Sequence, residues 1–134
     1  MSNFQFFVQE YIPTQVMDEF DIINPNLLFK KMILCIKQFH SYGYVHRDIK
    51  PDNFMIKSAI VKLIDLGMAK KYLDAEGNHI ENASGRQVIG SPNFTSENSL
   101  RGFELARRDD LEMLGYTFLY MLLGSKLPWI SETP

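Results

Sequence analysis

Two short polar segments, each beside an apolar run, constrain this chain more than any other feature. The first is His46-Arg47-Asp48-Ile49-Lys50-Pro51-Asp52-Asn53, and the second, Asp65-Leu66-Gly67, begins twelve residues after Asn53. The apolar runs Asn53 to Ile56 and Ile60 to Ile64 fit two strands, and the three residues between them are few enough for a hairpin. The two expected strands therefore flank the residues best suited to carry chemistry.

One long helix is expected before this region and another after it. Asn24-Pro25 is a helix start signal, because an N-cap residue precedes a proline at the first helical position. Apolar residues then recur at three- and four-residue spacing to near Gly43, and a second apolar helix spans Asp110 to Leu123 and stops at Gly124. The expected apolar stripes are Leu28, Met32, Ile33, Ile36 and Phe39 on the first helix and Leu111, Leu114, Phe118, Met121 and Leu122 on the second.

The remaining segments complete an α+β arrangement. Phe4 to Tyr11 is rich in aromatic residues and reads as a strand closed by Pro13, and Gln15 to Phe20 fits a short helix. Residues 73 to 106 are rich in glycine, asparagine and serine, and we expect one long loop there. A loop of that length within a compact domain is most often functional.

Composition excludes several classes of protein. The 134 residues suit one domain, and 14 basic against 16 acidic side chains give no electrostatic case for binding nucleic acid or an anionic membrane. No apolar run approaches the ~20 residues of a membrane span, and the first residues lack the basic start of a signal peptide. Cys35, the single cysteine, excludes an internal disulfide and is expected to be a small buried core residue. We expect a cytoplasmic or nuclear location.

The first polar segment fits the catalytic-loop pattern of protein kinases: His-Arg-Asp, an apolar residue, three others and then Asn. The chain thus resembles the protein kinase superfamily, which implies transfer of the γ-phosphoryl group of ATP by positioning and charge neutralisation. Asp48 would accept the proton of the incoming hydroxyl, and Lys50 would extend beside it and pair with the γ-phosphate. Asn53 and Asp65 would hold Mg²⁺, because hard cations prefer oxygen ligands. The alternative is a turn decorated with solvated charges.

Further motifs resemble one branch of that superfamily, the casein kinase I family. They are Pro51-Asp52-Asn53-Phe54, Asp65-Leu66-Gly67-Met68-Ala69-Lys70-Lys71-Tyr72, Arg107-Arg108-Asp109-Asp110-Leu111-Glu112-Met113-Leu114-Gly115-Tyr116, and Gly124-Ser125 followed by Leu127-Pro128-Trp129. Lys50-Pro51 is similar to the serine/threonine type rather than the tyrosine type. The resemblance spans essentially the whole chain. It implies a protein serine/threonine kinase that uses ATP and Mg²⁺ and has proteins bearing Ser or Thr as substrates.

The resemblance also implies roles around the nucleotide and the substrate. Glu10 and Ile12, in the expected hinge, would bond adenine through their backbone groups. Met55 would lie under the adenine ring, with a plain core methionine as the alternative. Ser91 would lie near the substrate hydroxyl, with a simple turn serine as the alternative. Asp110 would anchor the backbone of the catalytic loop from below.

The three histidines are not expected to be catalysts or metal ligands. His46 would pack behind the Asp65 turn, and His40 and His79 would be ordinary helix-end or loop residues.

Three positions depart from the casein kinase I pattern. Leu66 replaces a phenylalanine of the metal-binding turn and keeps an apolar plug there. Glu97 places a charge where the family has an apolar residue. Ala83 stands where a basic residue would bind phosphorylated substrates, which argues against a preference for pre-phosphorylated targets.

The expected domain is a partial protein kinase domain, truncated at both ends. Residues 1–12 would form the last strand of the small lobe and the hinge, and residues 13–134 an incomplete, mainly α-helical large lobe with a short hairpin. The glycine-rich loop, the strand lysine and the regulatory-helix glutamate are not found in the sequence. We therefore expect weak or no ATP turnover by this chain alone.

There are two alternatives to a kinase. One is a non-catalytic, pseudokinase-like interaction module, and the other is a degenerate fragment that does not fold stably. The intact Asp48, Lys50, Asn53 and Asp65 favour the kinase.

Overall fold

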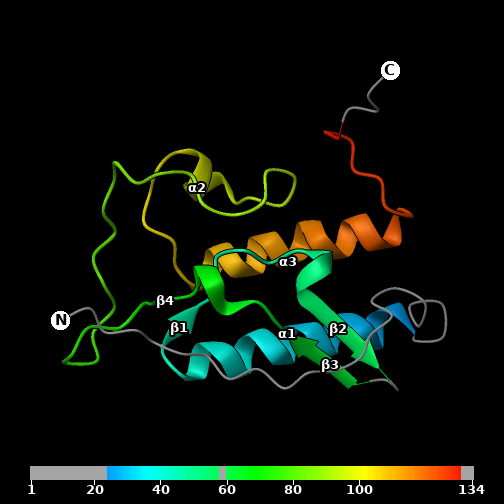
Figure 1. Ribbon diagram of the computed structural model, residues 1–134, viewed down its shortest axis with the longest axis horizontal. Coiled ribbons are helices and arrows are strands. Elements are labelled where there is room, and N and C mark those ends of the chain that lie inside the picture. Colours follow the sequence, from blue (N-terminus) through cyan, green and yellow to red (C-terminus); the bar gives the residue numbers. More distant parts are fainter. Residues whose placement is uncertain (1–23, 58–59, 131–134) are drawn as a thin grey trace.

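The computed structural model describes residues 24–57 and 60–130. The expected strand Phe4 to Tyr11, the helix Gln15 to Phe20 and the hinge residues Glu10 and Ile12 lie outside the described residues. In chain order the elements are α1 (Pro25–Ser41), β1 (Tyr44–Val45), the 3₁₀ turn η2 (Pro51–Asn53), β2 (Phe54–Lys57), β3 (Ile60–Leu63), the 3₁₀ turn η3 (Leu66–Met68), β4 (Lys70–Lys71), α2 (Glu97–Leu100) and α3 (Arg107–Leu122) (Figure 1).

Helix α1 begins where the sequence predicts. The side chain of Asn24 accepts a hydrogen bond from the backbone N–H of Asn26, and Pro25 occupies the first turn, where its missing N–H costs nothing. The helix ends at Ser41, and Gly43 follows in the left-handed region with φ of 83°.

The buried face of α1 follows the expected stripe only in part. Leu28, Met32 and Ile36 are buried, while Ile33 and Phe39 are half-buried. The four-residue spacing continues to His40, which is buried as well.

Cys35 is half-buried rather than fully buried, which corrects the expectation from its apolar neighbours. It sits at the edge of the core, and its Sγ donates to the backbone oxygen of Val61 on β3, 3.0 Å away. Burial raises the pKa of the Cys35 thiol, because a thiolate is disfavoured where solvent is excluded.

Helix α3 starts at Arg107, three residues before the expected start. Asp109 accounts for the difference, because its carboxylate reaches back to the backbone N–H of Ala106 at the N-cap (2.7 Å). The helix ends at Leu122, and Gly124 follows with φ of 64°, as the stop signal predicts.

The expected stripe on α3 is wrong at two of its five positions. Leu114 and Met121 are buried and Phe118 is half-buried, but Leu111 and Leu122 are each 49% exposed. The buried face is instead completed by Asp109, Asp110, Met113 and Thr117. This helix packs against the polar loop of residues 46–53 as well as against α1, so its inward face carries polar side chains that an apolar pattern does not reveal.

Strands β2 and β3 form the predicted antiparallel hairpin. The paired residues run from Phe54 opposite Leu63 to Lys57 opposite Ile60. A second antiparallel pair, β1 with β4, was not expected; it joins Tyr44 to Lys71 and Val45 to Lys70. The two pairs place residues 46–53 between one strand of each.

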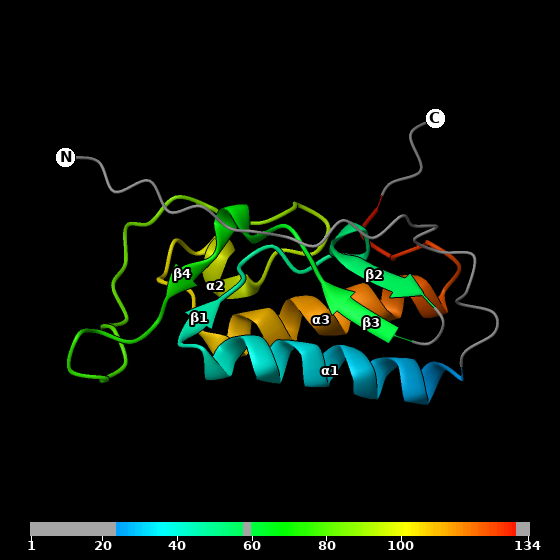
Figure 2. The same ribbon diagram turned by 60° about the horizontal axis from the view of Figure 1, so that its bottom comes forward.

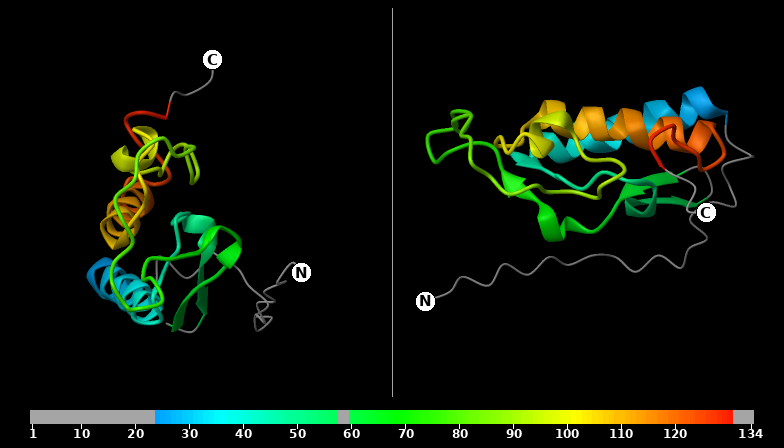
Figure 3. Two further views of the ribbon diagram at one scale, coloured as in Figure 1. Left: turned by 90° about the vertical axis from the view of Figure 1, so that its left-hand side faces the viewer. Right: turned by 90° about the horizontal axis from the view of Figure 1, so that it is seen from above.

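The elements form two layers around one core (Figures 2 and 3). Helices α1 and α3 lie side by side in one layer, and the β2–β3 hairpin packs against α1 as the second layer. The core joins α1, α3, β2 and β3. Its residues are Leu28, Met32, Ile36, Ile49, Phe54, Ile56, Val61, Leu105, Met113, Leu114 and Met121. The described part is thus an α+β arrangement of helices with small antiparallel strands.

Residues 73–106 are largely irregular, as expected, but not entirely. The short helix α2 interrupts them, and Ser96 caps it by accepting from the backbone N–H of Ser99 (3.3 Å). The Glu97 side chain is exposed and pairs with Arg101 one turn later (2.6 Å). The charge of Glu97, where an apolar residue was expected, therefore points away from the core.

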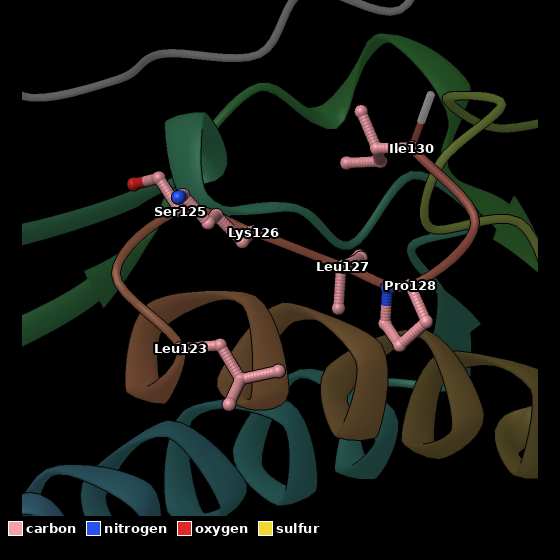
Figure 4. A pocket seen from close by; sticks show the side chains of 6 residues that line it. All are labelled: Leu123, Ser125, Lys126, Leu127, Pro128 and Ile130. Atoms are coloured by element: carbon pink, nitrogen blue, oxygen red, sulfur yellow. The ribbon is translucent and has the colours of Figure 1, made fainter. Parts of the chain in front are cut away.

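The segment after α3 folds back over the end of the helix. Leu127 is buried, and a cavity of about 540 Å³ lies between this segment and the end of α3, lined by Leu123, Ser125, Lys126, Leu127, Pro128 and Ile130 (Figure 4). None of the predicted site residues lines it. Among residues 24–57 and 60–130, no helix is both long and apolar enough to cross a membrane.

Candidate active site

The loop from His46 to Asn53 is fixed from below by a buried carboxylate. Asp110, in the first turn of α3, accepts the backbone N–H of His46 and of Arg47, each at 2.8 Å. Arg47 adopts φ of 70°, a left-handed conformation that non-glycine residues rarely adopt, and these two bonds stabilise it. The expectation that Asp110 anchors this loop is confirmed.

Three side chains meet above that loop. The Lys50 ammonium lies 3.1 Å from Asp48 Oδ2 and donates to Ser91 Oγ at 3.0 Å. The Ser91 hydroxyl donates to the other Asp48 oxygen, Oδ1, at 2.9 Å. We refer to Asp48, Lys50 and Ser91 as the triangle. Asp48 is only 9% exposed, so its interactions with both partners are strengthened by partial exclusion of water.

Asn53 is turned toward the same carboxylate. Its Nδ2 donates to the backbone oxygen of Asp48 (2.8 Å) and lies 3.4 Å from Asp48 Oδ2. Because the nitrogen is engaged there, the amide oxygen is the atom that would bind a cation.

Asp65 is brought close to Asn53 by the end of the hairpin. The backbone N–H of Ile64 donates to the backbone oxygen of Asn53 at 2.9 Å. Asp65 itself has φ of 58°, is exposed, and accepts the backbone N–H of Gly67 at 3.2 Å. The two residues that the sequence selects as Mg²⁺ ligands thus sit on adjoining backbone segments.

His46 is a structural residue in this arrangement. Its ring is fully buried, with Nε2 lying 2.9 Å from the backbone oxygen of Ile64 and Nδ1 accepting from the backbone N–H of Asp48 (3.3 Å). These partners place the ring proton on Nε2. The imidazole links the loop to the residue before Asp65, as the sequence predicts.

Met55 lies on the face of β2 opposite Phe54 and Ile56 and is not part of their core cluster. Phe54 and Ile56 belong to the core, and side chains alternate between the two faces of a strand, so the intervening Met55 faces the other way. Met55 is itself buried, with 8% of its surface exposed, so it fits both the adenine-floor interpretation and a plain core methionine. Glu10 and Ile12, the other expected nucleotide contacts, are outside the described residues.

His40 is a positioning residue that the sequence reasoning missed. Expected to be an ordinary helix-end residue, it is buried and its Nε2 lies 2.7 Å from Asp110 Oδ2. Its position four residues after Ile36, in the buried row of α1, was the available signal. His79, by contrast, is exposed in the loop, as expected.

Arg47 and Glu104 also hold the site together without having been predicted. Arg47 Nε donates to the backbone oxygen of Met68 (2.6 Å), which ties the loop of residues 46–53 to η3. Burial lowers the pKa of Arg47, and the negative charges of Glu104 and Asp110 oppose that shift. The Glu104 carboxylate is buried and pairs with Lys70 (2.7 Å) and Arg86 (2.9 Å), so it joins β4 to the long loop.

The oxygen-rich set of Asp65 and Asn53 suits a hard cation bound together with phosphate oxygens. Mg²⁺ commonly takes only one or two protein ligands and completes its octahedron with phosphates and water. In the described part of the chain, no group of three or more His, Cys, Asp or Glu side chains could hold a metal by itself. The two oxygen ligands of Asp65 and Asn53 fit a cation whose remaining positions are filled by phosphate oxygens and water.

The family model described as Protein kinase domain matches residues 5–133 of this chain. The match covers the triangle, both candidate Mg²⁺ ligands and the helices that support them.

Proposed function

This chain belongs to the protein kinase domain family, and from that premise we propose that it is a casein kinase I-like protein serine/threonine kinase. It would transfer the γ-phosphoryl group of ATP to Ser or Thr hydroxyls of protein substrates. The triangle is the observation that carries the proposal, because it holds a carboxylate, an ammonium and a hydroxyl at mutual hydrogen-bond distance. The serine/threonine and casein kinase I assignments rest on the sequence motifs described above.

Asp48 is proposed as the group that accepts the proton of the attacking hydroxyl. Asn53 holds the Asp48 main chain, and Asp110 holds the loop beneath it, so the carboxylate is set before substrate arrives. Lys50 would pair with the γ-phosphate, a short movement from its present contacts with Asp48 and Ser91. Ser91 would contact the substrate hydroxyl region.

Asn53 and Asp65 would hold Mg²⁺, which neutralises charge on the phosphates when it is bound. Met55 would contact the adenine ring, together with the backbone of Glu10 and Ile12. Protein substrates and ATP are the proposed partners, and the cytoplasm or nucleus is the proposed location.

The decisive experiment compares two aspartates of the same loop. The full chain is incubated with radiolabelled ATP, Mg²⁺ and casein, and phosphate transfer is measured for the wild type, Asp48→Asn and Asp52→Asn. We expect Asp48→Asn to lose about 10²–10⁴-fold in rate, the usual contribution of a positioned acid or base. Asp52 is exposed on η2, so Asp52→Asn should change the rate little.

Acceptor type is tested in the same assay with matched peptides bearing Ser, Thr or Tyr. Transfer to Ser and Thr but not Tyr is the expected result. Transfer by this chain alone is expected to be weak, so the assay uses long incubations at high chain concentration. Equal Mg²⁺-dependent rates for wild type and Asp48→Asn would contradict the proposal. No Mg²⁺-dependent transfer at all would favour the non-catalytic interaction module.

A further inference from the structure

The Ser91 hydroxyl makes the contact with Asp48 that the proposed chemistry requires of an acceptor hydroxyl. It donates to Asp48 Oδ1 at 2.9 Å and accepts from the Lys50 ammonium at 3.0 Å. A substrate hydroxyl would have to reach the same carboxylate. We propose that Ser91 is itself a phosphorylation site, modified within its own chain, and this inference rests on the proposed function.

The backbone around Ser91 holds the hydroxyl in that place. The Ser91 carbonyl accepts from Thr95 Oγ1 (2.7 Å) and from the backbone N–H of Phe94 (2.9 Å). Gly90 has φ of 102°, and a Cβ at this position would lie 3.1 Å from the backbone oxygen of Arg47. The segment is therefore seated closely on the catalytic loop, and no large movement is needed to present Ser91 to that loop.

The step balances within the proposed chemistry. A bond forms between Ser91 Oγ and the γ-phosphorus, while the bond from that phosphorus to the bridging oxygen of ADP breaks. The electron pair of the broken bond leaves with ADP. The Ser91 proton passes to Asp48 Oδ1, its present hydrogen-bond acceptor.

Phosphorylation would limit the activity of the chain. The phosphate would carry nearly two negative charges beside the Asp48 carboxylate and would engage Lys50, whose ammonium already contacts Ser91 Oγ. It would also fill the space in front of Asp48. The modified chain should thus phosphorylate external substrates poorly.

The experiment incubates the purified full chain with ATP and Mg²⁺ and follows intact mass, the modified peptide and transfer to a serine peptide. We expect a gain of one phosphate on Ser91 at a first-order rate that does not depend on chain concentration. Transfer to the peptide should fall about tenfold or more in parallel, because the phosphate on Ser91 adds negative charge beside Asp48 and blocks access to that carboxylate.

Three variants make the assignment specific. Ser91→Thr keeps a hydroxyl and should still gain phosphate at residue 91, whereas Ser91→Ala should not. Ser84→Ala is the matched control, because Ser84 is an exposed serine of the same long loop, and it should behave as the wild type does.

The outcomes separate this inference from the proposed function. Sustained transfer to the serine peptide without phosphate on Ser91 would overturn the inference and leave the proposed function standing. Phosphate on Ser91 at a rate that rises with chain concentration would overturn modification within one chain. Phosphate on neither Ser91 nor the peptide would overturn both.

Discussion

At the scale of single residues, one carboxylate organises the site. Asp110 has three donors: the backbone N–H groups of His46 and Arg47, and the ring of His40. A buried carboxylate is stable only when such partners satisfy it. His40 thus connects the end of α1 to the loop of residues 46–53 through a residue of α3, although no sequence motif predicts the contact between His40 and Asp110.

Replacing His40 should weaken both stability and activity. His40→Leu keeps an apolar volume but leaves Asp110 with one donor fewer, so we expect a loss of about 1–3 kcal/mol in the free energy of unfolding, measured in urea. The neighbouring Ser41→Ala removes only an exposed hydroxyl bonded to Gln38 and should stay within about 0.5 kcal/mol. Equal stability of the two variants would show that the His40 contact contributes nothing.

The pKa of Cys35 gives a pH-dependent prediction. Burial raises it, so the native thiol should react with iodoacetamide along a pH profile shifted above that of the chain in urea. A raised pKa in the folded state contributes stability that is complete below the unfolded pKa and is lost as pH rises through the folded pKa. Cys35→Ala should abolish the labelling. A native profile at or below the unfolded one would refute the shift.

At the scale of elements, the two long helices differ in how well their apolar pattern describes them. Helix α1 buries Leu28, Met32 and Ile36 as the spacing predicts. Helix α3 buries Asp109 and Asp110 instead of Leu111, because two of its neighbours are polar loops rather than apolar surfaces. Asp109 accepts from the side chains of Ser96 and Asn98, both at 2.9 Å, which fixes α2 against the start of α3.

This register on α3 can be tested with two leucines of one helix. Leu114 is buried in the core, so Leu114→Ala should cost about 2–5 kcal/mol in unfolding free energy. Leu111 is 49% exposed, and Leu111→Ala should cost much less. Both changes have the same effect on helix propensity, so the difference reports burial alone. Equal costs would show that Leu111 is buried, as the apolar spacing in the sequence predicts.

At the scale of the whole described region, a packed core of helices and strands, referred to as the rigid base, supports the long irregular segment of residues 73–106. The core joins α1, α3 and the β2–β3 hairpin, and the triangle lies where the loop between β1 and β2 meets the long segment 73–106. Residues 74–79 and 84–88 of that segment are exposed. The site thus combines groups fixed by the core with one group, Ser91, that follows an irregular segment.

Hydrogen exchange should reveal this division. Interior amides of α1 and α3 are hydrogen-bonded and close to the core, so they should exchange slowest, and amides of residues 74–79 and 84–88 should exchange fastest. The measurement is exchange followed by mass spectrometry of peptides. Comparable protection of the long loop and the helices would contradict the picture of a rigid base.

The sequence by itself determined the two long helices, the β2–β3 hairpin and the residues selected for the chemistry. Caps and spacing act locally, so Asn24-Pro25, the hairpin and the stop at Gly124 could be predicted from neighbouring residues alone. The motif spacing likewise selected Asp48, Lys50, Asn53 and Asp65. The roles of these residues remain proposals. Their closeness to one another, however, is already implied by the short spacing within the loop and by the predicted hairpin, which returns the chain to Asn53.

Only the tertiary structure decided which polar residues are buried and what they contact. His40 and Asp110 are 70 residues apart in the chain, and Ser91 and Asp48 are 43 apart. Such contacts depend on how α1, α3 and the long loop pack, which local propensity does not encode. The pairing of β1 with β4 and the exposure of Leu111 arise in the same way, because burial is a property of the assembled layers and not of a segment.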